Sequence, residues 1–212
     1  MDDLGAIIFH DMTVLQGMLL ILASFAGSFI TIALGIGGGA MLLAVMASIL
    51  PPAALIPLHG VIQLGSNFFR AAMMLRDTNL TPLIGFSIGA VVGAALGGSV
   101  AVNLSPALVQ IGVGLFIIWT VLAKPPRWLS HIPWAAGGIS SFLTMFFGAT
   151  GPFVASYIKA LSLPRHAHTA TQAVAMTIQH GLKTAVFATL GFAFWPWIPF
   201  LTLMIIAGAL GT

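Results

Sequence analysis

The sequence predicts an all-α integral membrane protein built from two tandem internal repeats. Of its 212 residues, 59% are hydrophobic and only 5% are charged, whereas about a quarter of the residues of a soluble domain are charged. Proline and glycine divide the chain into apolar segments close to the ~20 residues that cross a bilayer. The third observation is a self-similarity at one fixed spacing. Together these features exclude an appended soluble enzyme or a nucleic-acid-binding module.

Hydropathy and the proline and glycine positions predict seven spans. In chain order they are Val14–Leu34, Pro52–Leu75, Pro82–Val102, Pro106–Ala123, Pro133–Phe147, Ala167–Phe192 and Pro196–Leu210. The first is no signal peptide, because Met1-Asp2-Asp3 is acidic and the apolar run that follows is too long. Thr81-Pro82 and Ser105-Pro106 are typical helix starts, since a hydroxyl N-cap followed by proline satisfies the free amides.

Two shorter apolar segments, Ala40–Leu50 and Phe153–Leu163, each have 11 residues, or about 16 Å of helix. The first follows the glycine-bearing break Gly35-Ile36-Gly37-Gly38-Gly39, and the second follows Gly148-Ala149-Thr150-Gly151-Pro152. Each segment ends at a leucine-proline pair. Because they span about half the hydrocarbon thickness, we predict two re-entrant half-helices.

A shift of 113 residues relates the two halves without a gap from Ser28 to Arg76, and it places Pro51 on Pro164 and Arg70 on Lys183. Biased composition alone would not align breaks, prolines and lone cations. We therefore predict an N-terminal repeat over residues 1–123, with four spans and half-helix 40–50. The C-terminal repeat covers residues 133–212, with three spans and half-helix 153–163. Its missing fourth span predicts that the natural protein continues through an eighth span.

Four spans per repeat would make the repeats parallel, whereas half-helices that cross the membrane fully would make them inverted. The tryptophans favour the parallel arrangement, because it places all five near one membrane face, as in an interfacial belt. They are Trp119, Trp128, Trp134, Trp195 and Trp197. The same arrangement puts Arg76, Lys124 and Arg127 on one side and Lys159 and Arg165 on the other, which leaves the orientation open.

The two breaks imply an internal site, because irregular backbone at membrane depth is tolerated only inside protein or beside a water-filled cavity. Half-helices beginning near Ala40 and Phe153 would direct their positive N-termini at that site, which favours an anion. Glycines spaced by four along the third span are instead expected to let helices pack. These are Gly85, Gly89, Gly93 and Gly97.

Polar side chains form a stripe on each of two long spans at helical spacing. The first stripe is His59, Gln63, Ser66 and Arg70 with Asn67 beside it, and the second is His168, Gln172, Gln179 and Lys183 with His180 beside it. An Arg or Lys near a helix centre costs ~2.5–3.5 kcal/mol on insertion scales, so Arg70 and Lys183 are expected to face a cavity. The alternative is that they snorkel to the interface.

No carboxylate lies inside a predicted span, because Asp2, Asp3, Asp11 and Asp77 all lie at or beyond span ends. Cation transporters usually hold carboxylates at their sites, so the expected substrate is a small anion. The predicted substrate-binding residues are Gly37, Gly38, Gly39, His59, Gln63, Asn67, Arg70, Thr150, Gly151, Gln172, Gln179, His180 and Lys183. No catalytic residue, metal ligand or cofactor is expected.

Histidines leave two interpretations open. His59 and His180 could titrate and couple transport to protons, or they could only join helices through hydrogen bonds. His166 and His168 at a span's mouth are a weak metal signal, because no Cys or carboxylate accompanies them.

The glycine-rich break, Leu50-Pro51-Pro52 and the span with Ser66-Asn67-Phe68-Phe69-Arg70 resemble the sulfite exporter TauE/SafE family, also called the 4-toluene sulfonate uptake permeases. The resemblance covers essentially the whole chain. It implies an integral permease of the cell (inner or plasma) membrane with about eight spans, moving sulfite, organosulfonates or related sulfur oxyanions. The second break departs from the first, with Thr150-Gly151-Pro152 in place of three glycines, so the half-sites are not equivalent.

We therefore expect a secondary transporter for a small anion, with sulfite or an organosulfonate first, and not an enzyme. A passive anion channel would use the same residues. A membrane-embedded enzyme and a divalent-metal permease using His59 and His180 are further alternatives. The expected partners are the anion and the lipid bilayer, with protons as a candidate coupling ion and no nucleic acid. A homo-oligomer is an open alternative to a monomer.

Overall fold

The computed structural model describes residues 8–10, 12–101, 105–123 and 126–212, and within these ranges it contains helices and connecting segments but no strand. Asp2, Asp3, Asp11, Val102 and Lys124 lie outside the described residues. The α-helices are α2 (Val14–Leu34), α3 (Gly38–Ala47), α4 (Pro52–Met73), α5 (Thr81–Ala101), α6 (Pro106–Leu122), α7 (Pro133–Phe147), α8 (Gly151–Ala160), α9 (Arg165–Thr189) and α10 (Ile198–Leu210). Short 3-10 turns are η1 (Leu75–Asp77), η2 (Arg127–His131) and η3 (Trp195–Trp197).

Each predicted segment coincides with a helix, and most ends agree within three residues. Ser105 caps α6 as predicted, because its hydroxyl accepts from the amide of Leu108 at 3.4 Å. Thr81 is not a cap but the first residue of α5, and its amide donates to the Asn79 side chain at 3.3 Å. Pro82 is therefore the second residue of the helix, whereas the sequence predicted that it would be the first.

Glycine ends the helices that precede both breaks. Gly35 has φ +80° and Gly148 has φ +72°, and Gly37, which precedes α3, has φ +104°. Only glycine adopts such angles without strain. The two ten-residue helices α3 and α8 follow directly, and the first residue of α3, Gly38, is buried whereas Gly37 before it is exposed.

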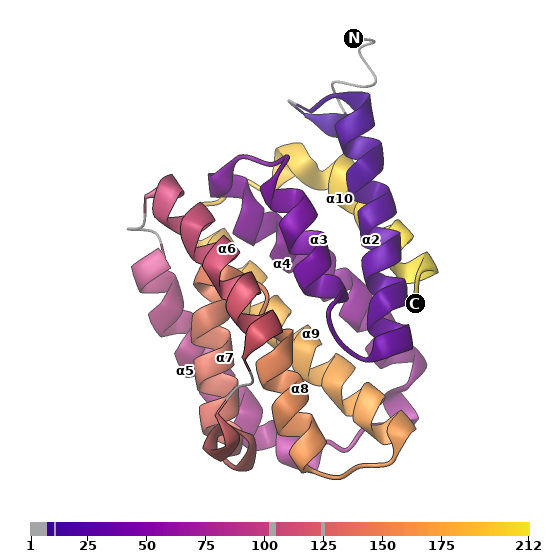
Figure 1. The fold of residues 1–212 in the computed structure, drawn as a ribbon, viewed down its shortest axis with the longest axis vertical. Coiled ribbons are helices and arrows are strands. Elements are labelled where there is room, and N and C mark those ends of the chain that lie inside the picture. The colour runs from indigo at the N-terminus through magenta and orange to yellow at the C-terminus, as the bar shows by residue number, and fades with distance from the viewer. Residues whose placement is uncertain (1–7, 11, 102–104, 124–125) are drawn as a thin grey trace.

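Helix directions differ from the expectation. Gly60 lies against Lys183, whereas Arg70, farther along α4, lines a cavity with Gln172, which comes earlier in α9. Helices α4 and α9, which the 113-residue shift pairs, are therefore antiparallel, and Figure 1 shows α2 and α7 running in opposite directions too. The parallel arrangement is wrong, because the break and α3 carry the chain back toward the end where α4 begins.

The tryptophans do not share one end. Trp197 stacks on His10 near the start of α2, with ring centroids 4.5 Å apart, whereas Trp134 lies at the start of α7, at the opposite end in Figure 1. Within the described residues, the exposed cations are gathered instead of split, because η1 contacts α9 and η2 contacts α8 at one end. They are Arg76, Arg127, Lys159 and Arg165. This end is called the cationic end below.

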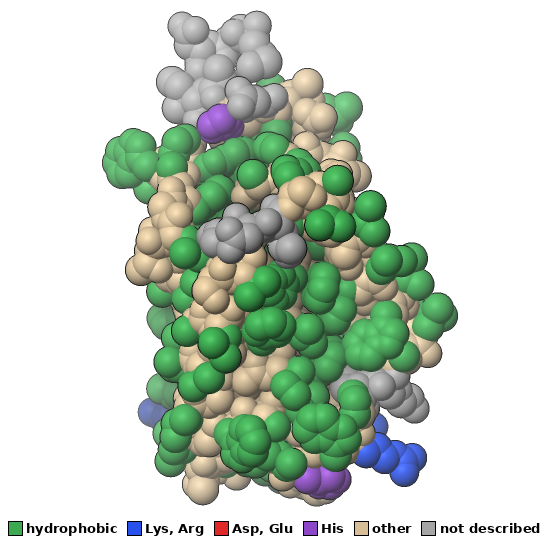
Figure 2. All heavy atoms as spheres, turned by 90° about the vertical axis from the view of Figure 1, so that its left-hand side faces the viewer, with side chains coloured by type: hydrophobic (Ala, Val, Ile, Leu, Met, Phe, Trp, Pro, Cys, Tyr) green, Lys and Arg blue, Asp and Glu red, His purple; other side chains and the backbone are tan. Residues whose placement is uncertain are grey.

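The exterior is apolar. Figure 2 shows a face covered mostly by hydrophobic side chains, with Lys and Arg only toward one end. Exposed side chains include Leu122, at 80%, and Val121, at 76%, as expected of a lipid-facing surface. Judged by length and hydropathy alone, α2 and α5 could each cross a bilayer, and α3, α6 and the segment Trp195–Leu210 are apolar but shorter.

The glycine stripe of α5 packs against α7, which confirms its expected role. A Cβ on Gly89 would collide with the carbonyl of Trp134, and one on Gly93 would collide with the carbonyl of Gly138. The two helices are thus held backbone to backbone, as small residues allow in membranes.

The contact between α5 and α7 predicts the effect of a single methyl group. Gly93→Ala should lower the free energy of unfolding by ~1–3 kcal/mol, because the methyl group has no room to relax. The control is Gly114→Ala in α6, where a Cβ meets nothing within 4 Å. Thermal unfolding in detergent measures both variants, and a Gly93→Ala protein as stable as Gly114→Ala would contradict the close packing.

Candidate functional site

A cavity of about 50 Å³, with several polar side chains in its wall, lies between the two breaks and the long helices α4 and α9. It is lined by eight of the predicted site residues, namely Gly37, Gly39, His59, Gln63, Asn67, Gly151, Gln172 and His180. Five further lining residues belong to the predicted breaks or begin the first half-helix, namely Ile36, Ala40, Gly148, Ala149 and Pro152, whereas the sequence did not single out Thr31 and Met176 as site residues. We call this space the central cavity.

The N-termini of α3 and α8 both border the central cavity, but they offer different numbers of amides. The first residues of a helix have no intrahelical acceptor for their amides, and no side chain caps α3 at Gly37. In α8, Pro152 has no amide hydrogen, and the amide of Phe153 already donates to the Thr150 carbonyl at 3.0 Å. The N-terminus of α3 therefore offers more amide hydrogen bonds to an anion than the N-terminus of α8. The two half-sites thus differ, as the sequence of the second break led us to expect.

His180 is the most conspicuous side chain of the central cavity. It is 1% exposed, and neither ring nitrogen has a hydrogen-bond partner in the described part of the chain. Its ring meets that of His59 edge to face, with centroids 6.0 Å apart. A buried polar group without a partner costs ~1–3 kcal/mol, so a ligand in the cavity would relieve this cost.

Arg70 lies in a second, smaller cavity of about 20 Å³ that shares Thr31 and Gln172 with the central cavity. Its side chain is 4% exposed, so it does not snorkel. Nη1 donates to Asn67 Oδ1 at 3.2 Å, while Nε and Nη2 have no partner among the described residues. We call this space the Arg70 corner.

Asn67 is itself held by Gln63. Its side-chain amide donates to the Gln63 carbonyl at 2.8 Å and to Gln63 Oε1 at 3.2 Å. The amide group is thereby oriented with Oδ1 toward Arg70, so three residues of one α4 face act as a single unit.

Lys183 does not line the central cavity. It is fully buried, and Nζ donates to His59 Nδ1 at 3.5 Å. His59 Nε2 donates to the Gly39 carbonyl at 3.0 Å, which requires the tautomer that leaves Nδ1 free to accept. Lys183 and His59 thus connect α9 and α4 to the first turn of α3, at the end of the cavity away from Arg70.

Thr150 and Gln179 lie behind the cavity wall. Thr150 Oγ1 donates to Gln179 Oε1 at 3.2 Å, and Gln179 Nε2 donates to Ser140 Oγ at 2.9 Å. Gly38 is also behind the wall, because a Cβ there would meet the Gly27 carbonyl. These three predicted residues support the second break and the start of α3 but do not face the cavity.

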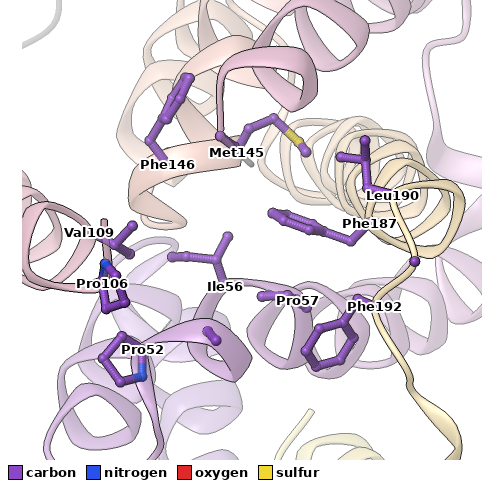
Figure 3. Close-up of a pocket in the computed structure, with 13 residues that line it drawn as sticks. Pro52, Ile56, Pro57, Pro106, Val109, Met145, Phe146, Phe187, Leu190 and Phe192 are labelled. Atoms are coloured by element: carbon purple, nitrogen blue, oxygen red, sulfur yellow. The ribbon is translucent and has the colours of Figure 1, made fainter. Parts of the chain in front are cut away.

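An apolar chamber of about 420 Å³ lies beyond Lys183, away from the cationic end. Figure 3 shows Ile56 and Pro57 of α4, Met145 and Phe146 of α7 and Phe187 of α9 around it. Sequence analysis missed this chamber, because its apolar lining cannot be distinguished by pattern from ordinary core. The buried pair of Lys183 and His59 lies between the chamber and the central cavity in the order of residues along α4 and α9.

No carboxylate is found among the described residues that line the central cavity or the Arg70 corner. Nor does the described part of the chain hold a group of three or more His, Cys, Asp or Glu side chains placed for a metal ion. The polar groups that face these two spaces are therefore amides, histidines, hydroxyls and one guanidinium.

Residues 19–212 match the protein family described as sulfite exporter TauE/SafE. No curated protein and no solved structure matches the chain significantly.

The buried hydrogen bonds behind the second break predict a stability effect. Gln179→Leu should lower the free energy of unfolding by ~1–3 kcal/mol, because the Thr150 hydroxyl loses its acceptor in a buried place. Gln110→Leu, at an exposed position of α6, is the matched control and should be neutral. Equal thermal unfolding of the two variants would show that Gln179 does not support the break.

Proposed function

We propose, because the chain belongs to the sulfite exporter TauE/SafE family, that it is a secondary transporter that moves a small sulfur oxyanion through the central cavity. Proteins of this family are membrane transporters, which fits the expectation that the chain is not an enzyme. Sulfite is the first candidate substrate. The substrate-binding residues proposed are those that line the central cavity, together with Arg70.

A single observation carries the proposal: buried hydrogen-bond donors beside the central cavity and the Arg70 corner have no acidic partner in the described part of the chain. His180 and the Nε and Nη2 atoms of Arg70 lack partners in the described residues, and the N-terminus of α3 adds free amides. Burying such groups is unfavourable unless something compensates them. An anion would accept hydrogen bonds from a guanidinium, from helix amides or from an imidazole N–H, whereas a cation would be repelled.

Cavity size favours a small anion. A cavity needs ~10–15 Å³ to hold one water molecule, so about 50 Å³ has room for a small ligand. Sulfite, with one sulfur and three oxygens, is of that size. A larger organosulfonate would require the cavity to widen.

We further propose that residues 1–123 and 133–212 are repeats of inverted topology, each with one half-helix, α3 or α8. The antiparallel course of α4 and α9 supports this arrangement. Inverted repeats place substrates at the repeat interface, next to discontinuous helices. Rocking of one repeat against the other, with the glycines at the breaks as hinges, would expose the cavity to each side in turn.

Lys183 and His59 are proposed as the closed side of this cycle. Their contact ties both long helices to the Gly39 carbonyl, and it separates the central cavity from the apolar chamber. Release of Lys183 from His59 would open that side. Protons are a candidate coupling ion through His59 and His180; a passive channel would instead conduct anions without coupling and would not accumulate them.

Orientation follows from the gathered cations. Cytoplasmic loops near membrane spans carry an excess of Lys and Arg, and Arg76, Arg127, Lys159 and Arg165 share one end. We propose that this cationic end faces the cytoplasm and that the membrane is the cell membrane. The central cavity, through the Arg70 corner, then lies on the cytoplasmic side of the Lys183–His59 contact.

An anion panel tests the proposed function. Sulfite should raise the unfolding temperature of the wild-type protein in detergent, and His180→Leu should raise the sulfite concentration needed at least tenfold. The substitution removes two unpartnered nitrogens and is not expected to destabilise the fold. Sulfate, thiosulfate, acetate and small sulfonates complete the panel, and exposed His131→Leu is the matched control.

Absence of stabilisation by every anion in the wild type would refute the anion site. In proteoliposomes, accumulation of labelled sulfite driven by a pH gradient would support a coupled transporter. Equilibration without accumulation under the same gradient would favour the passive channel.

Single cysteines test the orientation, because the chain contains none of its own. Leu80→Cys, before α5 at the cationic end, and Trp195→Cys, at the opposite end, replace side chains that are 60% and 81% exposed. In intact cells a membrane-impermeant thiol reagent should label only Trp195→Cys, and after permeabilisation it should label both. The reverse pattern would contradict the proposed orientation.

A further inference from the structure

We infer that Arg70 is the specificity-determining residue of this site, and that its free guanidinium edge takes two oxygens of one oxyanion. The inference rests on the proposed function and adds the class of ligand to it. Anions with two acceptor oxygens on one central atom, such as sulfite, a sulfonate or a carboxylate, fit this edge. Halides, with the same sign of charge but a single acceptor centre, do not.

The two free nitrogens of Arg70 are neighbours on the guanidinium. Nη1 is committed to Asn67 Oδ1 at 3.2 Å, so the unpartnered atoms Nε and Nη2 form the edge that donates two parallel hydrogen bonds. This fork matches the spacing of two oxygens on a carboxylate, a phosphate or a similar oxyanion. The arrangement is fixed rather than mobile, because Gln63 holds Asn67 through two hydrogen bonds.

The surroundings of the fork supply no acceptor from the described part of the protein. Arg70 is 4% exposed, and the one carboxylate in the described ranges, Asp77, is exposed in η1 and is not its partner. His168 and Thr169 line the same corner, and neither supplies a negative charge. Burying a guanidinium whose Nε and Nη2 lack hydrogen-bond partners costs free energy. An anion bound at these two atoms would remove that cost.

The size of the Arg70 corner indicates how the ligand lies. About 20 Å³ holds one or two waters at ~10–15 Å³ each, which is too small for a whole sulfite. Because the corner shares Thr31 and Gln172 with the central cavity, an oxyanion would place two oxygens on Arg70 and its remaining atoms toward the central cavity.

The repeat counterpart, Lys183, cannot perform this role. Its ammonium group is a point charge without a planar fork, and it is already bonded to His59. The two cations that the sequence pairs are therefore used differently, one for recognition and one for closure. An anion that approaches from the cationic end meets the fork first.

Arg70→Lys is the decisive variant, because it keeps the charge and removes the fork. Binding is measured as the half-maximal concentration for thermal stabilisation by sulfite and, separately, by chloride. Arg70→Lys should raise the half-maximal concentration of sulfite at least tenfold and change that of chloride by less than twofold. Arg70→Gln should raise the half-maximal concentrations of both anions. Arg76→Lys, at an exposed position of η1, is the matched control and should change neither.

An unchanged ratio of sulfite to chloride affinity in Arg70→Lys would overturn the inference, whether both anions bind as in the wild type or both are lost equally. If Arg70 variants do not fold, competition on the wild type gives the answer. Acetate and nitrate, which present two oxygens, should then displace labelled sulfite at concentrations at least tenfold below those of chloride and bromide. Equal displacement would overturn the fork, while failure of the wild type to bind any anion would refute the proposed function itself.

Discussion

The interior of this protein holds positive and hydrogen-donating groups that no described carboxylate neutralises. Arg70 and Lys183 are 4% and 0% exposed, and His180 and part of Arg70 lack any partner in the described chain. In an apolar surrounding such groups are costly unless they are paired. Lys183 has a hydrogen-bond partner within the protein, because its Nζ donates to His59. Arg70 Nε and Nη2 and the two ring nitrogens of His180 have no such partner among the described residues. The proposed role of the protein follows from that difference, because the anion that it transports would supply the missing partner.

The two glycine-bearing breaks make this interior possible. They end α2 and α7 at Gly35 and Gly148, which both have positive φ angles, and they let α3 and α8 begin beside the central cavity. They also return the chain along the membrane normal, which makes α4 and α9 antiparallel. In the proposed inverted repeats, Lys183 is bonded to His59 while Arg70 keeps nitrogens without a partner in the described chain, an asymmetry that one state of an alternating-access cycle would have. Exchange of these two roles would give the opposite state.

Local features could be predicted from the sequence, and relations between distant helices could not. The break glycines and prolines fixed the helix ends, and helical spacing placed His59, Gln63 and Asn67 on the face that lines the cavity. The expectation that the two halves run parallel was wrong. It took the tryptophan positions as evidence and did not count α3 as a segment that reverses the direction of the chain. Lys183 is bonded to His59, whereas Arg70 keeps a free edge. This difference depends on side-chain geometry between α4 and α9. Hydropathy and spacing contain no information on it, since both residues are lone cations at equivalent positions.

The central claim, that an oxyanion completes the buried positive site, is tested most directly by locating one. Selenite is a heavier analogue of sulfite, and its selenium gives an anomalous diffraction signal. Crystals of the wild-type protein grown with selenite should show one strong anomalous peak where the central cavity meets the Arg70 corner, within hydrogen-bond reach of the Nε and Nη2 atoms through the anion's oxygens. Anomalous density found only at the exposed cations Arg76, Arg127, Lys159 and Arg165, or no bound selenite at all, would contradict the account.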